Sequence, residues 1–238
     1  FPQEVQVTFS NLENQGNPWG LDNESRGDWG KDLEIPTLAE VPDPEVLFWV
    51  GCAGSFDVRA KPTSRALVKI LNAAGVRFAI LGEEEMCCGD SARRMGNEYL
   101  AQTLMSGNVE VMGNYKFKKI VVSCPHGYNT LKNEYPQFGG KYEVVHHTEF
   151  LLELLRAGKL PLPKGLNGNG VVTYHDSCYL GRYNKLYAQP RALLVQSGVK
   201  WVEMPRHGED SFCCGGGGGQ MWMETDANTR INHRRLQE

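Results

Sequence analysis

The stretch SFCCGGGGGQMW, residues 211–222, sets the organisation of the chain, because its two adjacent cysteines have a counterpart upstream. The letters CCG occur again at residues 87–89. Each cysteine of a later set follows one of an earlier set by 126 positions: Cys178 follows Cys52, Cys213 follows Cys87, and Cys214 follows Cys88. Self-similarity at a constant offset indicates a duplicated structural module.

Residues next to the cysteines support the duplication. SRALVKIL, residues 64–71, matches PRALLVQS, residues 190–197, at the same offset. That offset places the counterpart of Cys124 beyond the last of the 238 residues. We therefore expect a fragment whose second module stops before its last ligands.

Short apolar runs alternate with helical patterns along the chain. The runs predict buried strands at residues 46–50, 77–81, 119–123, 142–146 and 170–175. The helical patterns cover residues 63–75, 91–108 and 147–159. This alternation predicts an α/β fold made of two duplicated modules, each a parallel sheet with helices on its faces.

Three segments follow from these patterns. Residues 1–44 show little periodicity and are predicted to form an extended N-terminal arm, docked through Trp19. Residues 45–160 form the first module, and residues 161–238 form the second, which we expect to be truncated. The Pro- and Gly-rich stretch 159–170 is predicted to link the modules.

All seven cysteines follow predicted strands, either directly or in the next loop. The carboxyl ends of parallel strands share one edge of a sheet, and open α/β sheets bind ligands at that edge. Thiols that are distant in sequence are therefore expected to converge there. The first set is Cys52, Cys87, Cys88 and Cys124, and the second is Cys178, Cys213 and Cys214.

Composition argues against several classes of function. The net charge is −3, from 25 basic and 28 acidic residues, so we expect no nucleic-acid surface. No apolar run reaches the length of a bilayer span. Seven cysteines is an odd number, and two pairs are adjacent, which disfavours a disulfide framework. Reduced thiols in a cytoplasmic setting fit better.

Reduced thiolates select zinc or iron–sulfur clusters. Structural zinc sites usually space paired cysteines by two to four residues, whereas adjacent cysteines suit a larger cluster with several metal atoms. Clusters also need backbone N–H groups directed at sulfur. Gly89, Gly215 and Gly216 are candidate cofactor-binding residues for this reason, because glycine lets the backbone approach closely. The alternative for the glycine run is a flexible linker.

Other residues near the cysteines have two interpretations each. His175 is a candidate proton shuttle beside Cys178, or a histidine that hydrogen-bonds the local loop. The three glutamates at residues 83–85 precede Cys87 and are expected to point to solvent. A metal-free dithiol reductase is the third function considered, but adjacent cysteines make a poor dithiol.

The motif C-x34-CCG, which occurs twice, resembles the cysteine-rich CCG domain of heterodisulfide-reductase-like iron–sulfur oxidoreductases. TYHDSCYLGRYNKLYAQPRALL and SFCCGGGGGQMWME are similar to the branch with electron-transfer-flavoprotein:quinone oxidoreductases and glycolate-oxidase iron–sulfur subunits. In that family five cysteines, ending C-x-x-C, can hold a noncubane [4Fe–4S] cluster. The fifth place is Gly127 here, so the resemblance implies four thiolates, with His126 or water as a further ligand, or a zinc site.

The resemblance implies an oxidoreductase. A flavoprotein or upstream clusters would deliver electrons to a noncubane or ordinary [4Fe–4S] cluster, which passes them to quinone or a disulfide. Implied partners are the flavoprotein donor and other iron–sulfur or membrane subunits, with attachment at the cytoplasmic face of the membrane through parts outside this chain. The alternative is a structural zinc-binding domain that docks within a larger redox complex.

Overall fold

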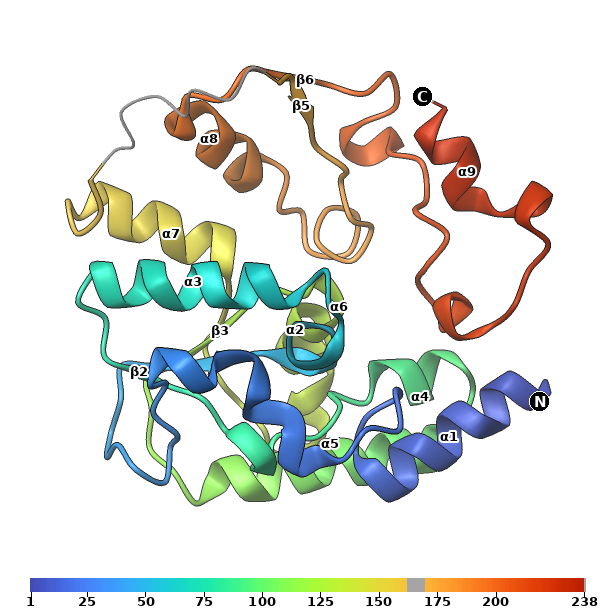
Figure 1. The fold of residues 1–238 in the computed structure, drawn as a ribbon, viewed down its shortest axis with the longest axis horizontal. Helices are drawn as coiled ribbons and strands as arrows, with labels where there is room; N and C mark the ends of the chain where they lie inside the picture. Colours follow the sequence, from blue (N-terminus) through green and yellow to red (C-terminus); the bar gives the residue numbers. More distant parts are fainter. Residues whose placement is uncertain (162–169, 238) are drawn as a thin grey trace. The chain divides into compact units, whose positions relative to one another are not determined.

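The computed structural model describes residues 1–161 and 170–237 (Figure 1). The chain forms two compact units, Phe1–His146 and His147–Glu238. Most of the expected link at residues 159–170 lies outside the described residues. The module boundaries at residues 45 and 161 therefore stay a prediction.

Unit 1 is built on a four-stranded sheet in the order β2-β1-β3-β4. All neighbouring strands are parallel, which confirms the α/β prediction. The central strand β1 pairs along its whole length with β3, from Val46 opposite Lys119 to Trp49 opposite Val122. The strands span Val46–Trp49 (β1), Phe78–Ala79 (β2), Lys119–Val122 (β3) and Val144–His146 (β4).

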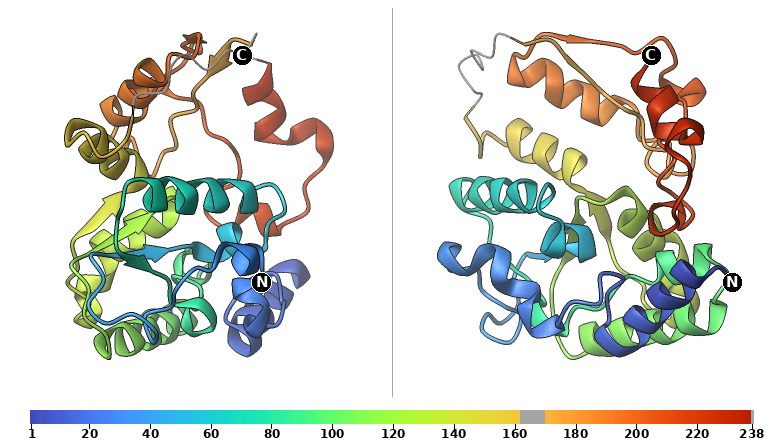
Figure 2. Two further views of the ribbon diagram at one scale, coloured as in Figure 1. Left: turned by 60° about the vertical axis from the view of Figure 1, so that its left-hand side comes forward. Right: turned by 45° about the vertical axis from the view of Figure 1, so that its right-hand side comes forward.

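Helices cover both faces of this sheet, with α3 (Lys61–Ala73) on one side and α5 (Glu98–Gly113) on the other (Figures 1 and 2). A parallel sheet needs this double cover because its strands are apolar on both faces, and all four residues of β1 are buried. Two short helices begin soon after strands: α2 (Gly51–Phe56) follows β1 after one residue, and α6 (Pro125–Asn129) follows β3 after two.

The single helix expected at residues 91–108 is wrong. The structure has α4 (Asp90–Arg94) and then α5, separated by a turn. Gly96 breaks the helix because its φ is 94°, a left-handed conformation. The side chain of Asn97 then caps α5 by accepting a hydrogen bond from the N–H of Leu100 at 3.1 Å.

The expectation of an extended arm is also wrong over much of its length. Gln3–Gln15 form helix α1, and Asn23–Leu33 form a 3-10 helix, η1. The buried positions of α1 follow helical spacing: Val5, Thr8, Phe9 and Leu12. The predicted contact of Trp19 is confirmed, since its ring lies 6.4 Å from that of Phe56.

Unit 2 has a smaller ordered core. Helix α7 (His147–Arg156) packs against α8 (Ala188–Ser197). Strand β5 (Val172–Thr173) pairs in parallel with β6 (Trp201–Val202) and is exposed on both residues. Helix α9 (Ile231–Leu236) lies near the end of the described chain. Within residues 1–161 and 170–237, no helix combines the length and apolarity needed to cross a bilayer.

The packing of α1 generates a test of whether the arm belongs to unit 1. Leu12 is 1% exposed, so Leu12→Ala should lower the free energy of unfolding by about 2–5 kcal/mol. Val7→Ala is the matched control, because Val7 lies on the same helix and is 53% exposed. Urea unfolding, monitored by hydrogen exchange, measures the free energy of unfolding of both variants. An unchanged stability in Leu12→Ala would show that the arm does not pack on unit 1.

Candidate metal centre

The structure places the four cysteines of the first set after the strands of unit 1, as the sequence predicts. Cys52 lies in α2, immediately past β1. Cys87 and Cys88 lie in the loop after β2, and Cys124 caps the start of α6 after β3. Because these strands are parallel, all three connections leave from the same edge of the sheet.

The four thiols converge at this edge. The side chain of Cys87 hydrogen-bonds with those of Cys52 and Cys88. Cys124 interacts electrostatically with both Cys52 and Cys88. Cys52 and Cys124 thus belong to one cluster of thiols, although they are more than 70 positions apart in the chain.

The surroundings hold these thiols in the protonated form. Burial raises the pKa of Cys124, although the backbone N–H groups of Gly127 and His126 oppose that shift. The hydrogen bond with Cys87, followed by burial, raises the pKa of Cys52. Metal binding must therefore release protons from this site. Gly127, which stands where the resemblance implies a fifth cysteine, contributes an N–H directed at sulfur instead.

Gly89 is required where it stands. Its φ is 90°, and a Cβ atom there would lie 2.9 Å from side-chain atoms of Met105 and 3.1 Å from the carbonyl oxygen of Ala101. Its backbone N–H interacts with the thiol of Cys87 and opposes the rise in the pKa of that thiol. A side chain at this position would displace the turn that carries both cysteines.

The expectation that all three glutamates face solvent is wrong for Glu85. Glu83 and Glu84 are exposed, but Glu85 is 1% exposed. Its carboxylate accepts hydrogen bonds from the N–H groups of Val50 (3.1 Å) and Gly51 (2.9 Å). It also forms an ion pair with Arg26 at 3.0 Å. A buried carboxylate needs this full set of partners.

Arg26 is the functional candidate that sequence analysis missed. It is 2% exposed, and its Nη2 lies 3.6 Å from Sγ of Cys52. Arg26 and Glu85 are 59 positions apart, so no local pattern joins them. The one signal in the sequence was its spacing, since Arg26 stands three residues before Trp29, and residues three apart lie on one face of a 3-10 helix.

His126 has an acidic partner. Its Nδ1 lies 2.7 Å from a carboxylate oxygen of Asp90, and Asp90 also pairs with Arg94 at 3.1 Å. Arg94 and Arg93 in turn pair with Glu134. The network anchors α4, and with it the turn after Cys88, to the segment that follows α6.

The second set of cysteines lies in unit 2, and its thiols also interact. Burial, followed by the charges of Cys214 and Cys213, raises the pKa of Cys178. The N–H of Gly215 donates to Sγ of Cys213 at 3.3 Å. Gly216 donates to Sγ of Cys214 at 3.4 Å in the same way. Part of the glycine run thus directs N–H groups at sulfur.

His175 contacts Cys214. The hydrogen bond with His175 lowers the pKa of the Cys214 thiol to about 7. Arg235 Nε lies 3.2 Å from His175 Nδ1 and donates to it. The proton of a neutral His175 is therefore on Nε2, where it can serve as a donor. These partners are not part of the local loop, so both interpretations of His175 stay predictions.

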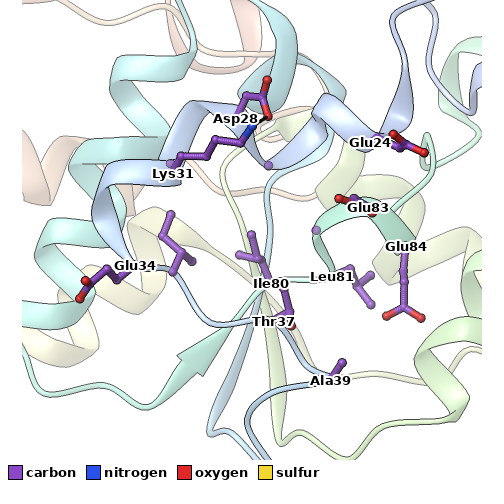
Figure 3. A pocket seen from close by; sticks show the side chains of 14 residues that line it. Glu24, Asp28, Lys31, Glu34, Thr37, Ala39, Ile80, Leu81, Glu83 and Glu84 are labelled. Atoms are coloured by element: carbon purple, nitrogen blue, oxygen red, sulfur yellow. Dashed lines mark ion pairs between the residues drawn. The ribbon is translucent and has the colours of Figure 1, made fainter.

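Units 1 and 2 each contain a cavity of similar size. In unit 2, a cavity of about 490 Å³ is lined by His175, Cys214 and Arg235, with an apolar wall that includes Val202 and Leu236. In unit 1, a cavity of about 480 Å³ has an apolar floor and an acidic rim (Figure 3). None of the seven cysteines lines the unit 1 cavity, and its carboxylates disfavour anionic ligands.

Across the described parts of the chain, no group of three or more His, Cys, Asp or Glu side chains is arranged to hold a metal ion. The thiols of Cys52, Cys87 and Cys88 interact with one another instead.

The contact of His175 with Cys214 has a pH-dependent consequence. A lowered pKa means that the metal-free Cys214 loses its proton near pH 7, so alkylation should accelerate as the pH rises through that value. His175→Ala should raise the midpoint toward the ordinary thiol value of about 8.5. His207→Ala is the control, since His207 bonds the carbonyl of Met204. Mass spectrometry of alkylated peptides measures the midpoint, and equal midpoints in all three chains would contradict the contact.

Comparison with known proteins agrees with the cysteine motifs. The chain is 49% identical over its whole length to the EtfAB:quinone oxidoreductase of Syntrophomonas wolfei, and 47% identical over 99% of its length to the probable iron-sulfur-binding oxidoreductase FadF of Bacillus subtilis. It is 35% identical over 92% of its length to one subunit of the dihydromethanophenazine:CoB–CoM heterodisulfide reductase of Methanosarcina barkeri.

The chain covers 34% of each of the first two relatives and 53% of the third. No solved structure matches it. The profile of the CCG cysteine-rich domain matches residues 46–132 and 172–238, which together exceed half of the chain. This match confirms the resemblance inferred from the repeated motif. The chain belongs to the CCG cysteine-rich domain family.

Proposed function

We propose that the chain is an electron-transfer module of an iron–sulfur oxidoreductase, with a cluster held by Cys52, Cys87, Cys88 and Cys124. The observation that carries the proposal is the convergence of these thiols beside a buried cation at one edge of unit 1. The names of the relatives support it, since they describe iron–sulfur oxidoreductases and a heterodisulfide reductase subunit.

The donor set fits a cluster in its chemistry. Four cysteine thiols are the usual ligands of an ordinary [4Fe–4S] cluster, whereas the noncubane cluster implied by the resemblance takes five. All ligands of a single zinc ion lie about 2.3 Å from one point, whereas adjacent cysteines can bind different irons of a larger cluster. The thiols lie together in protonated form, so loading requires that they lose their protons and separate around the incoming group.

The residues around the thiols have defined tasks in this proposal. The N–H groups of Gly89, His126 and Gly127 and the guanidinium of Arg26 offset negative charge on sulfur. Cys87 is buried and the other three cysteines are half-buried, so these interactions are stronger than they would be in water. When bound, the cluster would accept and release single electrons. The protein sets the potential through these contacts.

Unit 2 supplies a second proposed ligand set, Cys178, Cys213 and Cys214, with N–H groups from Gly215 and Gly216. The apolar cavity beside Cys214 supports a small organic electron acceptor at this end, a quinone or a disulfide. His175 lines that cavity, where it would supply a proton to a reduced acceptor.

The same proposal includes the electron donor and the cellular setting. Electrons would come from a flavoprotein or from other iron–sulfur segments. The names of the EtfAB:quinone oxidoreductase and FadF relatives support this, and the chain spans about a third of each of them. Oxidoreductase activity would need those further parts. The free thiols suit a reducing cytoplasmic setting, and membrane attachment would come from elsewhere in the complex.

Anaerobic reconstitution with iron and sulfide tests the proposal. The chain should bind iron and acid-labile sulfide in equal amounts and give an EPR signal on reduction or oxidation. Cys124→Ser should abolish the iron bound by unit 1. Cys213→Ser is the matched cysteine control and should leave that iron in place.

Two results would contradict the proposal. One is a single zinc ion per chain with no sulfide, which would favour a structural docking domain. The other is iron binding that survives in the Cys124→Ser chain at the level of the unaltered chain.

A further inference from the structure

We infer that Arg26, which the N-terminal arm contributes, is a positioning residue for the metal centre of unit 1 and sets the charge at Cys52. The inference rests on the proposed function. Arg26 lies outside residues 46–132 and 172–238, the segments that match the CCG domain. The site would therefore be incomplete without the arm.

The position of Arg26 is fixed on every side. Its Nη1 pairs with Glu85 at 3.0 Å, and its Nε donates to Oδ1 of Asn23 at 2.9 Å. Its Nη2 donates to the carbonyl of Gly16 at 3.3 Å and lies 3.6 Å from Sγ of Cys52. The guanidinium stacks over the ring of Phe56, 5.1 Å from its centroid. A lysine could not make all these contacts.

The arm also holds the loop that carries the adjacent cysteines. The carbonyl of Gly16 accepts a hydrogen bond from the N–H of Cys87 at 2.7 Å. The side-chain amide of Asn23 donates to the carbonyls of Glu83 (2.6 Å) and Glu85 (3.2 Å). Arg26 thus lies in a segment that is bonded directly to the cysteine loop.

The ion pair is oriented with its positive end at sulfur. Nη2 of Arg26 faces Cys52, while the carboxylate of Glu85 faces the N–H groups of Val50 and Gly51. The guanidinium of Arg26 stays charged, because arginine keeps its proton in proteins and the carboxylate of Glu85 lies 3.0 Å from Nη1. A fixed cation in a region of low dielectric favours the more negative state of whatever the thiols hold.

A purely structural ion pair would behave differently from a charge that acts on Cys52. Arg26→Met removes the positive end, so the reduction potential of the loaded chain should become more negative. Glu85→Gln removes the negative end and leaves the cation, so the potential should become more positive. Damage to packing would move both variants in one direction.

Two further variants serve as controls. Arg26→Lys keeps the charge and should restore most of the potential. Arg65→Met removes an arginine that also holds the arm, through the carbonyl of Trp29 and the carboxylate of Asp32, both at 2.6 Å. It should leave the potential unchanged, because these partners belong to the arm and not to the cysteine loop. Spectroelectrochemical titration of the anaerobically reconstituted chains measures all four shifts.

The metal-free chain supplies a second readout that does not need a cluster. At one fixed pH, the ratio of the rates at which Cys52 reacts with anionic iodoacetate and with neutral iodoacetamide should fall in Arg26→Met and rise in Glu85→Gln, because the cation lies 3.6 Å from Sγ of Cys52 and attracts the anionic reagent. If no chain takes up iron, the proposed function fails and this readout still decides the inference. Shifts of the same sign in both variants, or shifts in Arg65→Met as large as in Arg26→Met, would overturn the role of Arg26.

Discussion

Unit 1 depends on one constraint, which is the burial of the Glu85 carboxylate. A buried charge is tolerated only when it is paired and hydrogen-bonded, and removing one partner of such a pair typically costs about 3–5 kcal/mol. Glu85 meets the requirement with Arg26 and with the N–H groups of Val50 and Gly51. These partners come from the arm and from the end of β1. One carboxylate therefore joins the arm, the central strand and the cysteine loop.

The same junction determines the chemistry around the thiols. Parallel strands deliver Cys52, Cys87, Cys88 and Cys124 to one edge, where contacts between the thiols and partial burial raise the pKa of each thiol. Unit 2 brings an arginine to its cysteines by another route, since Arg235 contacts His175, which in turn contacts Cys214. The Cys214 thiol has a lowered pKa, whereas the pKa of its counterpart Cys88 in unit 1 is raised. The duplicated motif thus occurs in two different electrostatic settings.

Much of this arrangement follows from local sequence patterns. The strands of unit 1 and the position of each cysteine after a strand were predictable, because apolar runs and motif spacing are local signals. The burial of α1 was also encoded, in the spacing of Val5, Phe9 and Leu12, although the expectation of an extended arm missed it. The break at Gly96 was harder to foresee, since a single glycine is often tolerated in a helix.

The ion pair of Arg26 and Glu85 could not be predicted from local patterns. Its members are 59 positions apart, and each looks like an ordinary surface charge in its own segment. Only the fold shows that both are buried beside Cys52. The glycine content of this stretch predicted that backbone N–H groups point at sulfur. In the structure, the N–H groups of Gly215 and Gly216 donate to Sγ of Cys213 and Cys214.

The most direct measurement is anomalous X-ray diffraction from crystals of the reconstituted chain, recorded at the iron and zinc absorption edges. We predict an iron peak among Cys52, Cys87, Cys88 and Cys124, with the guanidinium of Arg26 beside it. A peak that appears only at the zinc edge, or the absence of iron from these four cysteines, would contradict the account.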